Sequence, residues 1–205
     1  MPKLVNDITP ASPDARDALL RAGAALFAQH GYSATGVQQI TDAAGVNKAM
    51  LYYYFGSKEG LYDLLIAEGI AAVEAAVGEA ESGAGPIAER LQRFIAHYLS
   101  IVVEHPAVAR ILFREVMAGG ERARQTVLDH FSNSLQRLAA LLASAQRAGE
   151  LHTRDAGLDA YSLFGMATMF IASHFVAGRP LDSQRFAAHI VDLFLHGAGR
   201  DEHTA

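Results

Sequence analysis

The sequence predicts an all-α protein of about nine helices, and three observations support this fold class. Apolar residues recur throughout at the i, i+3, i+4 and i+7 spacing that places them on one face of a helix. Signals for β-strands are nearly absent, because the sequence has no Asn-Gly turn and no sustained alternation of apolar and polar residues. The short segments between the apolar patterns contain glycine or proline, which interrupt helices.

The N-terminal part is expected to begin with a disordered arm, residues 1–12, of the kind that termini often carry. A first helix is expected from about Pro13 to Gln29, because proline suits a first helical turn and Gly31 can end the helix. Two short helices follow, at about 37–44 and 47–54, separated by a tight turn that contains glycine. This order is the pattern of a helix-turn-helix. Thr35 and Asn47 are placed to cap the two short helices.

A fourth helix is expected from Lys58 to about Ala80, and the linker 81–86 is the favoured domain boundary. The predicted organisation is a helix-turn-helix domain (13–57), a connecting helix (58–80) and a C-terminal helical domain (86–200). The C-terminal helices are expected at about residues 87–104, 107–118, 121–149, 155–177 and 183–196.

The formal net charge is −5, and residues 1–60 carry equal numbers of basic and acidic residues. If the protein binds DNA, a few well-placed groups must do so, with a strong dependence on salt. The chain has no cysteine, which removes disulfides and cysteine metal ligands and, without a signal peptide, favours the cytoplasm. The most apolar stretch, 160–173, is shorter than the roughly 18 residues that span a bilayer, so a buried helix and no membrane are expected.

The stretch "NKAMLYYYFGSK" has three adjacent tyrosines on the second short helix. At about 100° per residue, Leu51 and Phe55 share the face that packs inward, and Tyr53 points directly away from it. Tyr52 and Tyr54 lie on the two shoulders. A recognition helix needs this arrangement, because its outer face meets bases while its shoulders meet phosphates. Taken alone, the pattern equally fits an amphipathic helix whose rings cover hydrophobic neighbours.

Residues 31–65, "GYSATGVQQITDAAGVNKAMLYYYFGSKEGLYDLL", settle the choice, because they resemble the DNA-binding signature of the TetR family of bacterial transcriptional regulators. The resemblance covers about residues 16–66. It implies phosphate contacts from Thr35, Tyr52, Tyr54 and Lys58, and base contacts from Lys48, Ala49 and Tyr53. Met50, beside Tyr53, and Asn47, where the family often has Ser or Thr as the cap, complete the predicted DNA-binding set.

The resemblance also implies that the C-terminal helices bind a small effector. The predicted effector is largely apolar and of unknown identity. His97 lies on the shoulder of an apolar stripe, so it points either into a cavity or into solvent, and a solid core without a cavity is the alternative. The predicted pocket residues are Phe94, His97, Tyr98, Ile101, Phe113, Met117, Phe131, Leu135, Met166 and Phe170.

The last two helices are predicted to form a homodimer interface. The helix at 155–177 is apolar almost all round, and a second copy of the chain is the expected cover, with a core helix of the single chain as the alternative. The predicted interface residues are Phe164, Thr168, Ile171, Phe175, Phe186, Ile190, Leu193 and Phe194.

No catalytic, cofactor or metal site is expected, because the sequence has no H-E-x-x-H, G-x-S-x-G or P-loop motif. The predicted function is a ligand-responsive repressor that a small-molecule effector releases from a palindromic operator in double-stranded DNA. The alternatives are an effector-independent DNA-binding regulator and a helical small-molecule-binding protein.

Overall fold

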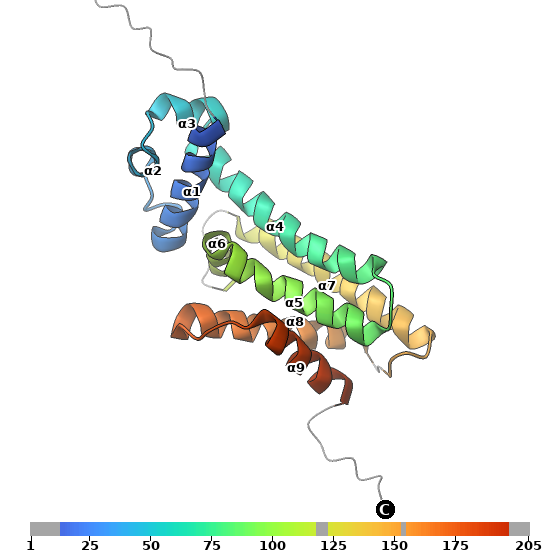
Figure 1. Ribbon diagram of the computed structural model, residues 1–205. Helices are drawn as coiled ribbons and strands as arrows, with labels where there is room; N and C mark the ends of the chain where they lie inside the picture. Colours follow the sequence, from blue (N-terminus) through green and yellow to red (C-terminus); the bar gives the residue numbers. More distant parts are fainter. Residues whose placement is uncertain (1–12, 118–122, 153–154, 197–205) are drawn as a thin grey trace, which may run out of the picture. The chain divides into compact units, whose positions relative to one another are not determined.

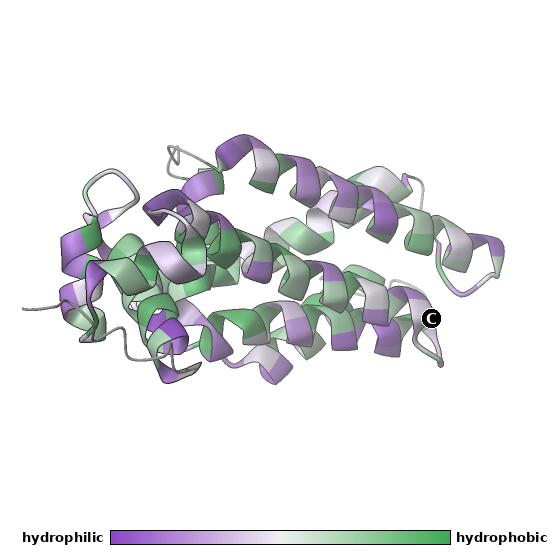
Figure 2. Ribbon diagram, turned by 90° about the horizontal axis from the view of Figure 1, so that it is seen from above, coloured by the Kyte–Doolittle hydropathy of each residue, from purple (hydrophilic) through white to green (hydrophobic). Residues whose placement is uncertain are grey.

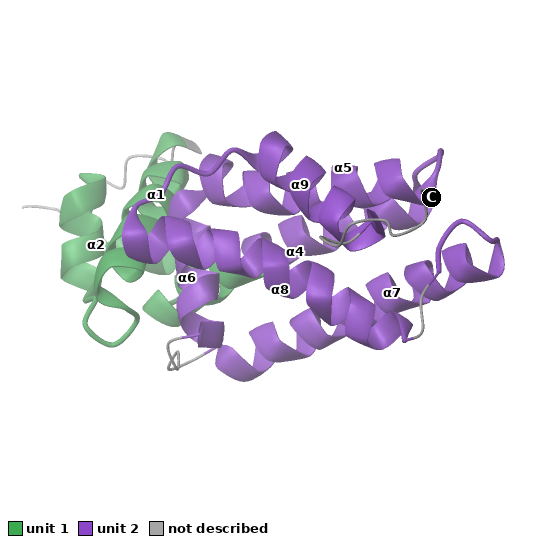
Figure 3. Ribbon diagram, turned by 90° about the horizontal axis from the view of Figure 1, so that it is seen from below, with its two compact units in different colours: residues 1–67 green, residues 68–205 purple. Residues whose placement is uncertain are grey.

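The computed structural model describes residues 13–117, 123–152 and 155–196, which belong to two compact units (Figure 3). Unit 1 is residues 1–67 and unit 2 is residues 68–205. Nine helices and no strand occur in the described ranges, so the all-α prediction is confirmed (Figure 1). The predicted arm at 1–12 lies outside the described residues. The helices are α1 Pro13–His30, α2 Val37–Ala44, α3 Lys48–Phe55, α4 Lys58–Ser82, α5 Ile87–Glu104, α6 Pro106–Met117, α7 Arg124–Arg147, α8 Ala156–Ala177 and α9 Ser183–His196.

The boundary between the units lies inside α4, between Ala67 and Glu68. The sequence favoured the linker 81–86, but that segment only joins α4 to α5 within unit 2. Leu61, in the first turn of α4, is fully buried, and it packs so closely on Gly23 of α1 that a methyl group there would lie 2.8 Å from its Cδ2. The start of α4 is therefore part of unit 1, and one continuous helix belongs to both units.

Besides the start of α4, unit 1 contains helices α1, α2 and α3, each of which contacts the other two. Leu19 of α1, Ile40 of α2 and Leu51 of α3 are fully buried and form its centre. Gly45 ends α2 with a φ of 68°, a left-handed conformation that suits glycine, and its amide donates to the carbonyl of Asp42. This short turn sets α3 against the other two helices, as a helix-turn-helix requires.

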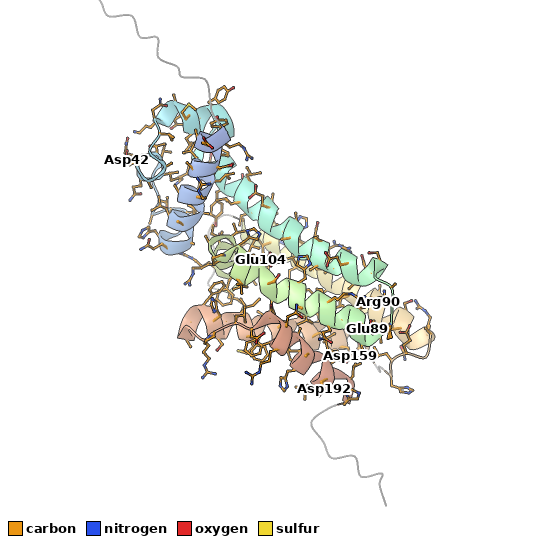
Figure 4. All side chains as sticks on the ribbon, viewed as in Figure 1. Asp42, Glu89, Arg90, Glu104, Asp159 and Asp192 are labelled. Carbon is orange, nitrogen blue, oxygen red and sulfur yellow. The ribbon has the colours of Figure 1, made fainter. Side chains whose placement is uncertain are left out.

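Unit 2 is a helical bundle in which α5 contacts α6, α8 and α9, and α7 lies along α8. Most of its helices carry hydrophobic and hydrophilic residues on different faces (Figure 2), and the hydrophobic faces form one core that includes Phe94 and Phe164. The α4–α5 connection is fastened by Arg90 (Figure 4), which donates to the carbonyls of Ala80 and Glu81 at 2.8 and 3.0 Å.

Helix α8 is longer than the apolar stretch from which its burial was inferred. By length and composition it could cross a membrane, as no other helix in the described ranges could, and 28% of its most apolar window is buried inside the chain. The length argument against a membrane is therefore wrong for this helix. Because its inner side packs on α5, α7 and α9, it also has the properties of a bundle helix in a soluble protein.

Candidate functional site

Helix α3 has the inner face that the sequence predicts. The side chain of Asn47 accepts a hydrogen bond from the backbone amide of Met50 at 3.1 Å, which confirms Asn47 as the cap. Leu51 is fully buried and Phe55 is half-buried. Gly56 then ends the helix with a φ of 71°. The side-chain oxygen of Asn47 is thus engaged within the protein, and its contribution is to hold the start of α3.

The outer face of α3 is exposed. Tyr53 is 73% exposed and Tyr52 is 52% exposed, while Lys48 and Ala49 are also exposed. These four residues leave a mixed surface of aromatic rings, a small apolar group and one positive charge. The angular positions inferred from the sequence are therefore those of the structure, and contact with DNA remains a prediction.

Tyr54 is less accessible than the other two tyrosines. It is half-buried, and its ring packs edge-on against Tyr53, with a centroid distance of 5.1 Å. Desolvation raises the pKa of its hydroxyl, the neighbouring Tyr53 adds to the rise, and Arg16 opposes it. The hydroxyl therefore stays protonated at neutral pH and can donate a hydrogen bond.

Thr35 does not cap α2. The N-cap of α2 is Gly36, whose amide donates to Oε1 of Gln39 at 2.7 Å. The Thr35 side chain is buried, and its hydroxyl donates to the carbonyl of Gly31 at 2.7 Å. A second contact, at 3.3 Å, is to the carbonyl of Leu26. The prediction of a cap is wrong, because the hydroxyl donates to the carbonyl of Gly31 and not to an amide of α2. A phosphate contact from Thr35 stays a prediction.

Lys58 is also engaged within unit 1. Its Nζ donates to the carbonyl of Tyr32 at 3.0 Å and to the carbonyl of Thr35 at 2.9 Å. The same ammonium lies 4.1 Å from the centroid of the Tyr32 ring, a favourable cation–π geometry. An ammonium has three donors, so at most one is left for a phosphate. Lys58 therefore acts first as a clamp on the loop between α1 and α2.

Unit 2 contains a cavity with a volume of about 200 Å³. Helices α4 to α8 all contribute to its wall, which is mostly apolar. Five of the ten predicted pocket residues line it, namely Tyr98, Ile101, Phe113, Met117 and Phe131. The prediction of a cavity rather than a solid core is thus supported for this part of the chain.

The other five predicted pocket residues lie elsewhere. Phe94 and Leu135 are buried in the core, and Met166 packs against that core. His97 lies near the surface, where its Nδ1 is 2.9 Å from Oε2 of Glu79. Phe170 stacks on Phe186 beside a surface groove, with a centroid distance of 4.3 Å. These placements differ from the prediction because a helical stripe shows which face turns inward but not which part of that face meets a void.

Polar groups at the cavity come from residues that the sequence did not single out for this purpose. Glu74 of α4 and His130 of α7 form a pair, with 2.7 Å between Oε1 and Nδ1. Ser134, which is buried, and Thr168 add hydroxyls, and the Tyr98 hydroxyl lies 3.5 Å from Oγ1 of Thr168. The sequence contains only a weak signal for Glu74, His130, Ser134 and Thr168, since each is a polar residue on an otherwise apolar helical face.

Four residues predicted at the dimer interface lie in the core or at the cavity of a single chain. Phe164 is fully buried, Ile190 is 1% exposed, and Thr168 and Ile171 line the cavity. Phe175, Phe186, Leu193 and Phe194 are only partly exposed. Phe164, Thr168 and Ile171 lie on the side of α8 that packs within its own bundle, and Ile190 is buried on α9. The single chain therefore does not support the assignment of these four residues to the interface.

The exposed side of α8 carries a different apolar stripe. Its members recur at helical spacing, and each is between 61% and 81% exposed. They are Leu158, Tyr161, Met169 and Val176. We call these four residues the α8 stripe. Met169 and Val176 also line the surface groove that contains Phe170 and Phe186. Among the described residues, no cluster of His, Asp or Glu side chains could hold a metal ion.

This geometry defines a class of protein: a helix-turn-helix unit with an exposed recognition surface, joined by a continuous helix to a helical unit with an internal cavity. Residues 19–65 match the family model of bacterial regulatory proteins of the tetR family. Residues 84–198 match the model of the tetracyclin repressor-like C-terminal domain. The chain belongs to the TetR family, whose members are transcriptional regulators and not enzymes.

Individual relatives agree with this assignment. The HTH-type transcriptional regulator RutR of Escherichia coli O157:H7 is 27% identical over 140 residues, which cover 68% of this chain and 66% of that regulator. The match thus spans slightly less than two thirds of this relative. The crystal structure of PfmR, a TetR family regulator from Thermus thermophilus, superimposes with a TM-score of 0.75 at 27% identity, covering 89% of this chain and 99% of PfmR.

A second similar structure is that of AibR in complex with isovaleryl coenzyme A and operator DNA. The TM-score is 0.67 at 22% identity, and the match covers 88% of this chain and 97% of AibR. At this identity the likeness shows the fold alone.

Proposed function

We propose that the protein is a homodimeric repressor that binds a palindromic operator through α3 and releases it when a small, largely apolar effector enters the cavity of unit 2. The observation that carries the proposal is that α4 belongs to both units. It begins in unit 1 with Lys58, which holds the α1–α2 loop, and it lines the cavity with Ile70, Val73 and Glu74. Such a regulator acts on chromosomal DNA in the cytoplasm.

The coupling follows from linkage. An effector shifts the protein between DNA-binding and non-binding states only if it binds one state more tightly than the other. Three cavity residues lie on α4, whose first turns belong to unit 1. A change in the cavity that moves α4 therefore also acts on unit 1. The complex of AibR with isovaleryl coenzyme A and operator DNA is consistent with an effector that carries an apolar group.

The direct test is a gel shift with purified protein and the DNA that flanks its gene. We expect a shifted band that needs a palindrome and weakens steeply as salt rises, because phosphate contacts release counterions. Half-sites are expected about 34–36 Å apart, or a multiple of that distance, as for other helix-turn-helix dimers. A shift that is the same for random DNA would contradict a sequence-specific operator.

We expect Tyr53→Ala to reduce discrimination between the cognate operator and random DNA. The ring lies on the outermost face of α3, where it can meet base edges and thymine methyl groups. The expected loss is about 1–3 kcal/mol on the cognate site, as for a good base contact. Titrations of both DNAs measure it, and Gln38→Ala, at an exposed position of α2, is the control. An equal loss on both DNAs would assign Tyr53 to the phosphate backbone.

We also propose that a second copy of the chain covers the α8 stripe. Met169→Glu places a charge within the stripe, so we expect the variant to elute as a monomer in size-exclusion chromatography with light scattering, and to lose its affinity for paired half-sites. Gln136→Glu, at an exposed position of α7, adds the same side chain elsewhere and should remain dimeric. A dimeric Met169→Glu protein would place the interface on another surface.

A further inference from the structure

The cavity lining contains a charged pair and a hydroxyl pair. Met117 is 59% exposed, and Glu74 and His130 are partly exposed, and we call these three residues the rim. Tyr98 packs between the rings of Phe94 and Phe164, with centroid distances of 6.2 and 5.3 Å, and Thr168 lies beside its hydroxyl. We call Tyr98 and Thr168 the floor. A ligand that passes the rim can bring its leading end to these two hydroxyls.

The charge of the lining limits what can reach this floor. Among the described residues that line the cavity, only Glu74 and His130 can carry a charge, and they pair with each other at the rim. The walls below them are aliphatic and aromatic, apart from neutral hydroxyl groups. A carboxylate or ammonium at the leading end would lose its hydration without gaining an opposite charge, which is costly. The leading end is therefore uncharged.

The hydroxyls at the floor favour a hydrogen-bonding group over a plain hydrocarbon. The Tyr98 and Thr168 oxygens are 3.5 Å apart, a distance longer than the usual hydroxyl–hydroxyl hydrogen bond. Each hydroxyl has one donor and two acceptor sites, so the pair can still bond to a ligand oxygen placed against it. Burial raises the pKa of Tyr98, and the contact with Thr168 opposes that rise, so the phenol is neutral and able to donate.

From this geometry we infer that the effector places an apolar body in the cavity, with one leading, uncharged hydroxyl or carbonyl group that binds to Tyr98 and Thr168. This inference rests on the proposed function, since it specifies the ligand of the same cavity. The volume of about 200 Å³ suits a compact body, because drug-sized ligands occupy pockets of roughly 300–1,000 Å³.

Three probes with one apolar body test the inference: 4-propylphenol, propylbenzene and 4-propylbenzoate. Each is titrated into the full-length protein at neutral pH, with binding followed by calorimetry and by ligand-observed NMR up to millimolar concentration. We expect 4-propylphenol to bind about 2- to 10-fold more tightly than propylbenzene, the range of one net neutral hydrogen bond. The benzoate should bind at least about 10-fold more weakly than the phenol, because its charge has no partner at the floor.

Two isosteric substitutions provide the matched control. In the double variant Tyr98→Phe, Thr168→Val, the preference for the phenol over propylbenzene should fall below about twofold, since both hydroxyls are gone. Propylbenzene should bind as it does to the unmodified protein, which shows that the cavity remains folded. A preference for the phenol that survives in this variant overturns the assignment of Tyr98 and Thr168.

Three other outcomes overturn the inference: equal binding of phenol and propylbenzene, tighter binding of the benzoate, or no binding of any probe to the unmodified protein. Operator binding is measured on the same samples by the gel shift. If the protein binds its operator but gives any of these outcomes, the inferred effector class is wrong and the repressor function is unaffected. If the unmodified protein prefers the phenol but does not bind an operator, the repressor function is wrong and the inferred ligand class is unaffected.

Discussion

Replacing Phe164 with alanine is expected to lower the free energy of unfolding by about 3–5 kcal/mol, the range for large aromatic residues in a core. Phe164 is fully buried in unit 2, and its ring packs against those of Phe94, Tyr98 and Phe131 with centroid distances of 5.3 Å in each case. Alanine would leave a cavity among these rings, which cannot collapse into it without leaving their own contacts. Urea unfolding followed by circular dichroism measures the loss.

Val103→Ala is the control for Phe164→Ala. Val103 lies on α5 and is 56% exposed, so its truncation should change the free energy of unfolding by no more than about 0.5 kcal/mol. The contrasting outcome is also informative. If Phe164→Ala keeps its stability but elutes as a monomer, Phe164 lies at a subunit interface, as the sequence pattern suggested, and not in the core of one chain.

The geometry of α3 could be predicted from sequence because it depends on local properties. A short helix that packs on one side has one buried face, so the position of Leu51 determines by rotation where Tyr53 points. The cap at Asn47 is likewise local, since it bonds to the amide three residues later. Thr35 was misassigned because its partners are carbonyls in the last turn of α1 and at Gly31, which a cap pattern does not include.

The two sides of α8 could not be assigned in this way. The helix is apolar almost all round, so Phe164 and Met169 are equivalent by hydropathy, although one is fully buried and the other is 69% exposed. Which side turns inward is decided by the packing of α5, α7 and α9, that is, by contacts between residues far apart in the sequence. The pair of Glu74 and His130 could not be predicted for the same reason, since it joins residues far apart in the sequence, one on α4 and one on α7.

Replacing Lys58 with methionine is expected to destabilise unit 1 by about 1.5–3 kcal/mol, the range for hydrogen bonds to a charged group. Methionine keeps the apolar stem of the side chain but removes the ammonium that binds the carbonyls of Tyr32 and Thr35. The loop that those carbonyls belong to connects α1 to α2 and so supports the position of α3. Thermal unfolding followed by amide hydrogen exchange in residues 13–67 measures the effect on this unit.

The salt dependence of DNA binding separates this role from the phosphate contact that the family resemblance implies. Each phosphate contact contributes about −0.9 to the slope of log affinity against log salt. If Lys58 is a clamp, the Lys58→Met variant loses affinity for cognate and random DNA to the same extent, because less of unit 1 is folded, and the slope is unchanged.

Lys48→Met is the matched control, because Lys48 is exposed at the start of α3. That variant should keep its stability and bind the cognate operator more weakly, since the family resemblance places Lys48 at the bases. A Lys58→Met protein with full stability and a reduced slope would show that Lys58 binds phosphate, despite its two carbonyl partners.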